Sequence, residues 1–291
     1  SDKQNELGKV PLDDITALIL TSNQVTLSKQ VITELTERGA ILVSCGNNYH
    51  PLSVTYPFAK NYFSSGTLKN QITASEPIKK SIWKFIVEQK INNQAHILMD
   101  CTGNEKTVRQ IEILSKRVKS GDPENMEAQA ARVYWRALMG ESFRRDKTSG
   151  GINSALNYGY TVLRAATARA VCGAGLNPSL GLHHRSDVNA FALADDLMEP
   201  FRPLVDSIVW KLQFDKKMPP PGEDLNNSES RLTPENKREI ASVLLIDMLT
   251  ERGMSPVANC LVRTAQSLAN SLKEKGRNIE LGQIVPGSQL L

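Results

Sequence analysis

The 291-residue chain has only four cysteines, and they are far apart. Cys45, Cys101, Cys172 and Cys260 form no C-x-x-C pair, which argues against structural zinc and against a disulfide scaffold. The chain also lacks an apolar run of about 18 residues, the length that a membrane-spanning helix needs. Residues 1–10 lack the charged-then-apolar pattern of a secretory signal. These absences argue against a membrane or secreted protein and favour a reducing cytoplasm.

Acidic residues are scarce between Arg132 and Arg185. The net charge of +4, from 35 basic and 31 acidic residues, does not by itself indicate a nucleic-acid binder. This stretch, however, holds eight basic residues against two acidic ones. Such an excess could cover a polyanion, or it could be an ordinary solvated helical surface.

The hydrophobic pattern changes near residue 75. Apolar runs at 15–21 and 40–45 are typical of strands, and residues 27–38 between them have helical spacing, so alone they predict a small βαβ unit. Residues 46–73 are rich in Asn, Ser, Tyr and Pro and predict a loop. From about Ser75 the pattern is helical almost to the end. The predicted helices are 75–94, 104–119, 123–140, 153–172, 188–212, 234–252 and 256–275.

Glu127 is an ionisable residue in an apolar helix face. In the helix predicted to start after Asp122 and Pro123, it shares a face with Ala130, Tyr134 and other apolar residues. A carboxylate facing a core is costly unless it is paired or binds a metal. The sequence leaves both explanations open: a bond to a buried arginine or backbone group, or a catalytic role.

A second polar cluster combines two histidines with an acidic helix. His183 and His184 follow a glycine-rich turn, and Asp195, Asp196 and Glu199 share one side of the next helix. Like charges so close favour a bound cation. The alternative is a solvated acidic face in which Arg202 pairs with Glu199.

Oxygen ligands with a single imidazole and no thiolate suit Mg²⁺ or Mn²⁺ better than zinc. Such ions serve phosphoryl chemistry, because they polarise the phosphorus centre and stabilise an attacking or departing oxygen. Together with the basic stretch between the two acidic sites, this predicts phosphodiester chemistry on nucleic acid.

Four ordered motifs resemble a known family. They are EAQAARVYW (127–135), LNYGYTVLRA (156–165), GLNPSLGLHH (175–184) and DLMEPFRPLVD (196–206). In this order they resemble the CRISPR-associated integrase, the larger protein of the universal spacer-acquisition pair. KINNQ (90–94) also resembles a family segment, and the wording of the last two motifs is most similar to the integrases of type II CRISPR systems.

The resemblance implies an α+β fold, in which a small β-rich N-terminal domain precedes a larger all-α catalytic domain. It places a dimerisation domain at 1–74 and the catalytic domain at 75–291. It replaces the βαβ expectation for residues 15–45. It also implies that the usual first strands of this domain are absent, so that Ser1 lies part-way along the first domain.

The resemblance also implies the site. The family's metal-binding glutamate falls on Glu127, its histidine on His184 and its final carboxylate on Glu199. Asp196 is either a further metal ligand or a group that hydrogen-bonds to a ligand. Asp195 is a weaker candidate for a ligand, and the role of His183 stays open. Pro200 is expected to kink or restart the helix. Candidates for phosphate contacts are Arg132, Arg136, Arg144, Arg145, Lys147, Arg164 and Arg185.

The implied activity is a divalent-metal-dependent DNA endonuclease and integrase. A prespacer 3′-hydroxyl would attack a phosphodiester at the leader-repeat border of a CRISPR array, with Mg²⁺ or Mn²⁺ as cofactor. The implied partners are double-stranded prespacer DNA, leader-repeat DNA, a second copy of the chain, and a small ferredoxin-like adaptation protein in a four-plus-two complex. The alternatives are a stand-alone metal nuclease on branched or single-stranded DNA, a DNA-binding scaffold without activity, and a mobile-element integrase.

Overall fold

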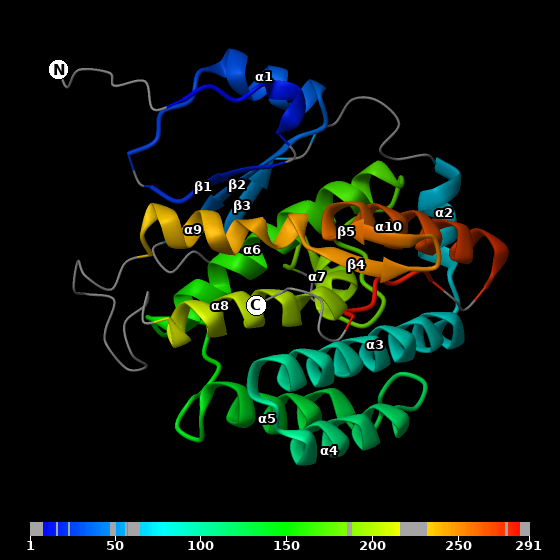
Figure 1. Cartoon of the computed structure of the whole chain (residues 1–291). Coiled ribbons are helices and arrows are strands. Elements are labelled where there is room, and N and C mark those ends of the chain that lie inside the picture. Colours follow the sequence, from blue (N-terminus) through cyan, green and yellow to red (C-terminus); the bar gives the residue numbers. More distant parts are fainter. Residues whose placement is uncertain are drawn as a thin grey trace.

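The computed structural model describes residues 8–15, 17–22, 24–46, 51–55, 57, 65–184, 188–215, 232–276 and 279–285 (Figure 1). Its strands are β1 (Ala17–Leu20), β2 (Ile41–Cys45), β3 (Pro51–Thr55), β4 (Asp247–Thr250) and β5 (Gly253–Pro256). Its α-helices are α1 (Lys29–Glu37), α2 (Ser65–Thr73), α3 (Glu76–Thr102), α4 (Glu105–Lys116), α5 (Met126–Met139), α6 (Ile152–Gly173), α7 (Ala192–Met198), α8 (Arg202–Phe214), α9 (Pro234–Ala241) and α10 (Val257–Glu274). Short 3₁₀ turns are η1 (Leu12–Asp14), η2 (Glu199–Phe201) and η4 (Ser242–Leu245).

The N-terminal part is a three-stranded sheet in the order β1-β2-β3. β1 and β2 are parallel and α1 connects them, while β3 pairs with β2 in the antiparallel direction. The α+β fold class is therefore confirmed. The βαβ unit first indicated by the local pattern is present, and its replacement on the strength of the resemblance was wrong. The reason is local: alternating strand and amphipathic helix, with Gly39 at positive φ ending the helix, already specify this crossover.

The helices form layers around α6 (Figure 1). α6 is 22 residues long and buried on most of its faces, because its many alanines and one close-packed glycine let α8, α9 and α10 approach it. On one side the sheet rests on it, with Ile41 and Val43 packed against Ala165 and Ala168. On the other side α3, α4 and α5 form a separate layer that faces α8 and η2. The region after the first sheet is thus dominated by helices, as expected.

Most predicted helices are confirmed, with shifted ends. The helix predicted at 75–94 continues to Thr102 and ends where Gly103 takes a left-handed conformation. The helix predicted from Pro123 starts at Met126 instead, because Asp122 and Asn125 adopt positive φ. The predicted restart at Pro200 is confirmed, since η2 separates α7 from α8.

Two predictions missed regular elements. Residues 46–73 were expected to be loop, yet they contain β3 and α2. The helix predicted at 234–252 ends at Ala241, and η4, β4 and β5 follow it. Met248 and Thr250 are buried while Asp247 and Leu249 are exposed, so this stretch has the period of a strand. The hairpin turn is residues 251–252, and Gly253 at positive φ begins β5 directly after it. The second region is therefore not entirely helical.

None of the helices in the described part of the chain combines the length and the hydropathy that a membrane crossing requires. The division into domains at residue 74 stays a prediction. α2, on the N-terminal side of that boundary, packs against α10, and Gln71 hydrogen-bonds to Asn177 and Leu180.

Candidate functional site

Glu127 lies in the first turn of α5. The carboxylate of Asp122 accepts hydrogen bonds from the backbone N–H groups of Met126 and Glu127, and Asn125 Oδ1 accepts one from Ala128. These caps satisfy the free donors at the helix start and fix its direction. The Glu127 side chain is 22% exposed, and its Oε1 lies 2.5 Å from Nζ of Lys90 on α3. The buried partner of Glu127 is therefore a lysine, not the arginine or backbone group that the sequence suggested.

Glu199 occupies the 3₁₀ turn between α7 and α8. Asn93 on α3 donates to the Pro200 carbonyl at 2.7 Å, which ties the turn to α3. The Glu199 side chain is only 4% exposed; Oε1 is 3.0 Å from Arg202 Nη2 and Oε2 is 2.5 Å from Lys90 Nζ. Burial opposes ionisation, but Arg202 and Lys90 outweigh it and lower the pKa of Glu199 below its ordinary value. The pairing of Arg202 with Glu199 exists, but in a buried setting rather than on a solvated face.

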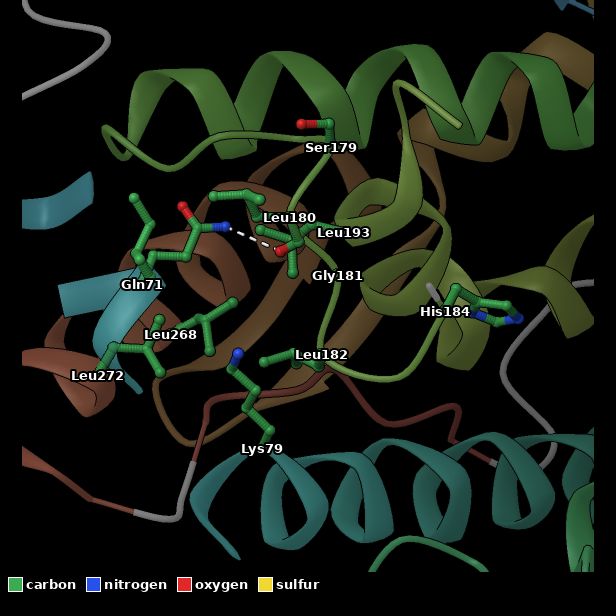
Figure 2. Close-up of a pocket in the computed structure, with 11 residues that line it drawn as sticks. Gln71, Lys79, Ser179, Leu180, Gly181, Leu182, His184, Leu193, Leu268 and Leu272 are labelled. Carbon is green, nitrogen blue, oxygen red and sulfur yellow. Dashed lines mark hydrogen bonds between the residues drawn. The ribbon is translucent and has the colours of Figure 1, made fainter. Parts of the chain in front are cut away.

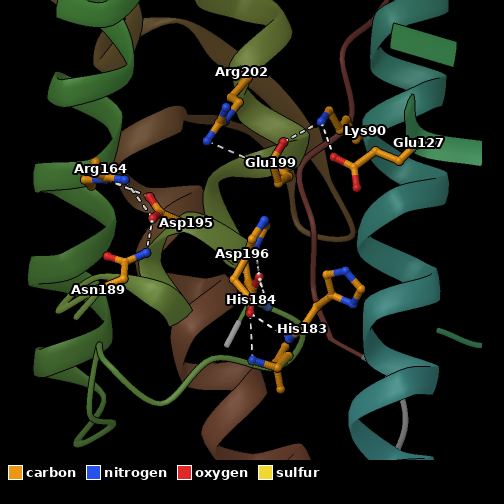
Figure 3. Close-up of polar contacts among 11 residues, drawn as sticks. Lys90, Glu127, Arg164, His183, His184, Asn189, Asp195, Asp196, Glu199 and Arg202 are labelled. Carbon is orange, nitrogen blue, oxygen red and sulfur yellow. Dashed lines mark hydrogen bonds and ion pairs between the residues drawn. The ribbon is translucent and has the colours of Figure 1, made fainter. Parts of the chain in front are cut away.

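Lys90 is the link between the two carboxylates. Burial alone would lower the pKa of Lys90, but the charges of Glu199 and Glu127 outweigh burial and raise it above its ordinary value. The ammonium is therefore held charged between one carboxylate from α5 and one from η2 (Figure 3).

His184 is held by Asp196. The Asp196 carboxylate is fully buried and accepts the backbone N–H groups of Leu182, His183 and His184, while His184 Nδ1 lies 2.5 Å from Asp196 Oδ1. This hydrogen bond is the main reason why the pKa of His184 is raised, and Glu199 and Glu127 add to it. Gly181 makes the turn feasible, because a Cβ there would lie 2.4 Å from the His184 carbonyl oxygen. Asp196 therefore orients the imidazole, and the His184 side chain remains 46% exposed.

His183 has a packing contact instead. Its ring stacks on the buried Trp83 indole with centroids 4.3 Å apart and planes nearly parallel. A cavity of about 290 Å³ lies beside the same loop, lined by Gln71, Lys79, Leu182 and neighbouring apolar side chains. His184 also lines this cavity, although its imidazole points away from the other lining residues in Figure 2, and neither Glu127 nor Glu199 lines it. The cavity and the acidic site therefore share only His184.

The structure brings Glu127, Glu199 and His184 together from three segments. The two carboxylates share one ammonium, and both act electrostatically on His184. In the arrangement described, no group of three or more His, Cys, Asp and Glu side chains is already spaced to hold a metal ion. Asp195 lies apart, in a two-point ion pair with Arg164 at 2.6 and 2.7 Å.

The donor set nevertheless fits a hard divalent cation. Two carboxylates already converge on a positive charge, and an oriented imidazole lies beside them. Oε2 of Glu199 is buried, and within the described residues the group that balances its charge is the ammonium of Lys90, 2.5 Å away. A buried carboxylate oxygen that relies on a cation for compensation is a position where a divalent ion is also favourable.

The predicted phosphate-binding residues differ in their surroundings. Arg132, Arg136, Arg144 and Lys147 are exposed, whereas Arg145 is partly buried. Arg145 donates to the side chains of Asn153 and Asn157. Arg164 is engaged by Asp195, and Arg185 lies outside the described residues.

Lys90 was not among the predicted site residues, and Arg202 was expected only as a surface partner of Glu199. The only signal for Lys90 was the KINNQ segment, in which Lys90 and Asn93 are three residues apart and therefore share a helix face. Both contact the turn that carries Glu199.

The sequence is similar to one protein family along most of its length. The family model described as CRISPR associated protein Cas1 matches residues 1–244. The CRISPR-associated endonuclease Cas1 of Neisseria meningitidis serogroup C (strain 8013) is 36% identical over 285 residues, covering 98% of this chain and 90% of that protein.

Two solved structures share the fold. A casposase bound to integration product has a TM-score of 0.78 and 23% identity, covering 95% of this chain and 83% of the other. A Cas6-RT-Cas1–Cas2 complex has a TM-score of 0.72 and 20% identity, covering 94% of this chain and 32% of the other.

Proposed function

The chain belongs to the family of the CRISPR-associated protein Cas1, and from this membership we propose that it is a divalent-metal-dependent DNA integrase and endonuclease. Its reaction would insert prespacer DNA into a CRISPR array by attack of a 3′-hydroxyl on a phosphodiester at the leader-repeat border. The observation that carries the proposal is the convergence of Glu127 and Glu199 on one buried ammonium, with His184 close enough for both carboxylates to raise its pKa.

Glu127, Glu199 and the imidazole of His184 would hold Mg²⁺ or Mn²⁺. The bound ion would neutralise charge on the scissile phosphate and stabilise the departing oxygen. Asp196 was also predicted as a ligand, but its backbone and His184 hydrogen bonds favour a positioning role. Because Nδ1 of His184 is hydrogen-bonded to Asp196, the other ring nitrogen would be the one that binds the metal ion.

Arg202 and Asn93 would keep Glu199 in place during the reaction. Arg202 Nη2 binds one carboxylate oxygen at 3.0 Å, and Asn93 fixes the next residue's carbonyl. Water attack in place of a 3′-hydroxyl would give strand cleavage, so integration and nuclease activity can share this site. Neither reaction needs a covalent bond to the protein.

The partners belong to the proposal as well. A Cas1–Cas2 complex among the solved structures that share the fold supports binding of a small Cas2-like protein, which we place in a four-plus-two assembly. We assign dimerisation to residues 1–74, catalysis to residues 75–291, and phosphate contacts to the exposed basic residues of and after α5.

The test is strand transfer with purified protein, its Cas2-like partner, a prespacer and a leader-repeat duplex. Glu127→Gln keeps the side-chain shape but removes the charge, so we expect product to fall by about 100-fold or more. Glu124→Gln is the matched control: Glu124 is exposed, pairs with Lys119, and is expected to leave product formation unchanged.

Full strand transfer by Glu127→Gln would reject this site. Cleavage of branched DNA that needs neither the partner nor a leader-repeat target would instead support the stand-alone nuclease.

A further inference from the structure

Lys90 has the surroundings of a bound cation. Its side chain enters from α3, is 11% exposed, and ends 2.5 Å from Glu127 Oε1 and 2.5 Å from Glu199 Oε2 (Figure 3). These oxygens belong to two different segments, α5 and η2, and the ammonium is what joins them. Three residues along the same helix, Asn93 binds the Pro200 carbonyl, so this face of α3 is built around the Glu199 turn.

Two buried or half-buried carboxylates cannot converge without a compensating positive charge. Arg202 compensates one oxygen of Glu199, which leaves Glu199 Oε2 and Glu127 Oε1 to Lys90. A divalent ion held by the same two carboxylates would occupy the same gap. An ammonium left beside it would be a buried like charge without a partner, which is strongly unfavourable.

We propose that Lys90 is a resident cation that competes with the divalent metal ion: it keeps Glu127 and Glu199 together in the metal-free protein and withdraws when the ion binds. This inference rests on the metal site of the proposed function. The flexible four-carbon stem of lysine suits such a movement, since the ammonium can turn toward solvent without displacing α3.

If Lys90 competes with the metal ion, removing the charge of Lys90 should raise the affinity of the protein for the metal ion. If the ammonium occupies the site about nine-tenths of the time, Lys90→Met should bind Mn²⁺ about tenfold more tightly than the unchanged protein, because the competent state is then always populated. Isothermal titration of EDTA-stripped full-length protein with Mn²⁺ measures this. Mn²⁺ should also raise the melting temperature of Lys90→Met more than that of the unchanged protein.

Lys84→Met is the matched control. Lys84 is on the same helix and forms a more exposed ion pair with Glu88 at 3.4 Å, so its Mn²⁺ affinity should equal that of the unchanged protein. A Lys90→Met variant that binds Mn²⁺ equally or more weakly would overturn the inference. Lys90→Gln, which keeps hydrogen-bond donors without charge, replaces it if the Met variant does not fold in EDTA.

A second measurement needs no variant. Acetylation of Lys90 by acetic anhydride, read by mass spectrometry with Lys84 as internal reference, should rise when Mn²⁺ is added, because the ammonium moves to solvent. Unchanged or reduced acetylation of Lys90 in Mn²⁺-saturated protein would overturn the inference.

The Mn²⁺ titrations also separate failure of the metal site from failure of the competition. If the unchanged protein and Glu127→Gln bind Mn²⁺ alike, the proposed metal site is wrong. If Glu127→Gln loses Mn²⁺ binding while Lys90→Met gains no affinity, only the competition by Lys90 is wrong.

Discussion

Asp206 on α8 is a buried carboxylate behind the proposed site. It is 1% exposed and accepts hydrogen bonds from the hydroxyls of Tyr134, at 3.1 Å, and Tyr160, at 2.5 Å. Arg202, which binds Glu199, lies over the Tyr160 ring with its guanidinium carbon 4.8 Å from the centroid. Burial raises the pKa of Asp206 to about 7, although both tyrosine hydroxyls act in the opposite direction. At neutral pH this carboxyl therefore sits near its titration point.

A prediction on pH and stability follows from Asp206. Its folded pKa lies above its unfolded value, so the folded state holds the proton more tightly. The stability from this group is fully present below the unfolded pKa of 3.8 and is lost as pH rises through about 7. We expect Asp206→Asn, which cannot ionise, to flatten the decline in unfolding free energy between pH 4.5 and 7 by up to about 1.4 kcal/mol per pH unit. Urea unfolding across this range measures the slope.

Asp146→Asn is the control for this experiment. The Thr148 backbone N–H is the first reason why the pKa of Asp146 is lowered, so its titration falls below the tested range. Its slope between pH 4.5 and 7 should match that of the unchanged protein. Identical slopes for the unchanged protein and Asp206→Asn would show that Asp206 does not hold its proton in the folded state.

The packing of α8 and α9 against α6 depends on a glycine at their crossing. Gly159, within the LNYGYTVLRA motif, has no side chain at the point where α8 and α9 cross α6. A Cβ there would lie 2.3 Å from Val205 Cγ1 and 2.9 Å from Ile240 Cγ2. The glycine therefore sets how closely these helices pack, and through α8 it affects where Arg202 stands.

We expect Gly159→Ala to destabilise the protein by about 1–3 kcal/mol, because α8 and α9 must shift to admit the methyl group. Thermal or urea unfolding measures the loss. Gly173→Ala, at the end of the same helix with nothing within 4 Å of the added Cβ, should be neutral or stabilising by up to about 1 kcal/mol. Equal stability of the two variants would mean that the crossing is not limited by space at Gly159.

The whole molecule carries its basic excess on a limited region. The exposed arginines and the lysine lie on α5 and in the segment between α5 and α6, while the overall charge is only +4. DNA bound there would release counterions in proportion to the phosphates contacted.

We expect replacing Arg136 and Arg144 by Gln to weaken DNA binding and to reduce the slope of log affinity against log salt by about 0.9 for each lost phosphate contact. Fluorescence anisotropy of a labelled duplex at several salt concentrations measures the slope. Lys273→Gln with Lys275→Gln, at the end of α10 and outside the basic stretch, removes the same charge and should leave the slope unchanged. A slope reduced equally by both pairs would point to net charge alone.

The sequence by itself determined the elements with strong local codes. Apolar periodicity indicated α3, α4, α6 and α10, and the alternation of strand, helix and strand indicated the N-terminal βαβ unit. It also indicated Glu127 as a carboxylate that needs a partner, and it placed His184 and Asp196 in one polar cluster. Both are short-range statements, since spacing along a helix or turn is enough to make them.

Only the tertiary structure decided what those groups face. Lys90 and Glu127 are 37 residues apart, and Lys90 and Glu199 lie still farther apart in the chain, so no local pattern could show that one ammonium joins both carboxylates. The hairpin of β4 and β5 was mistaken for helix because a short apolar run fits either period until its neighbours fix which side is buried. Long-range packing decides such cases, because the free energy of burying or pairing a side chain depends on what the rest of the chain brings to it.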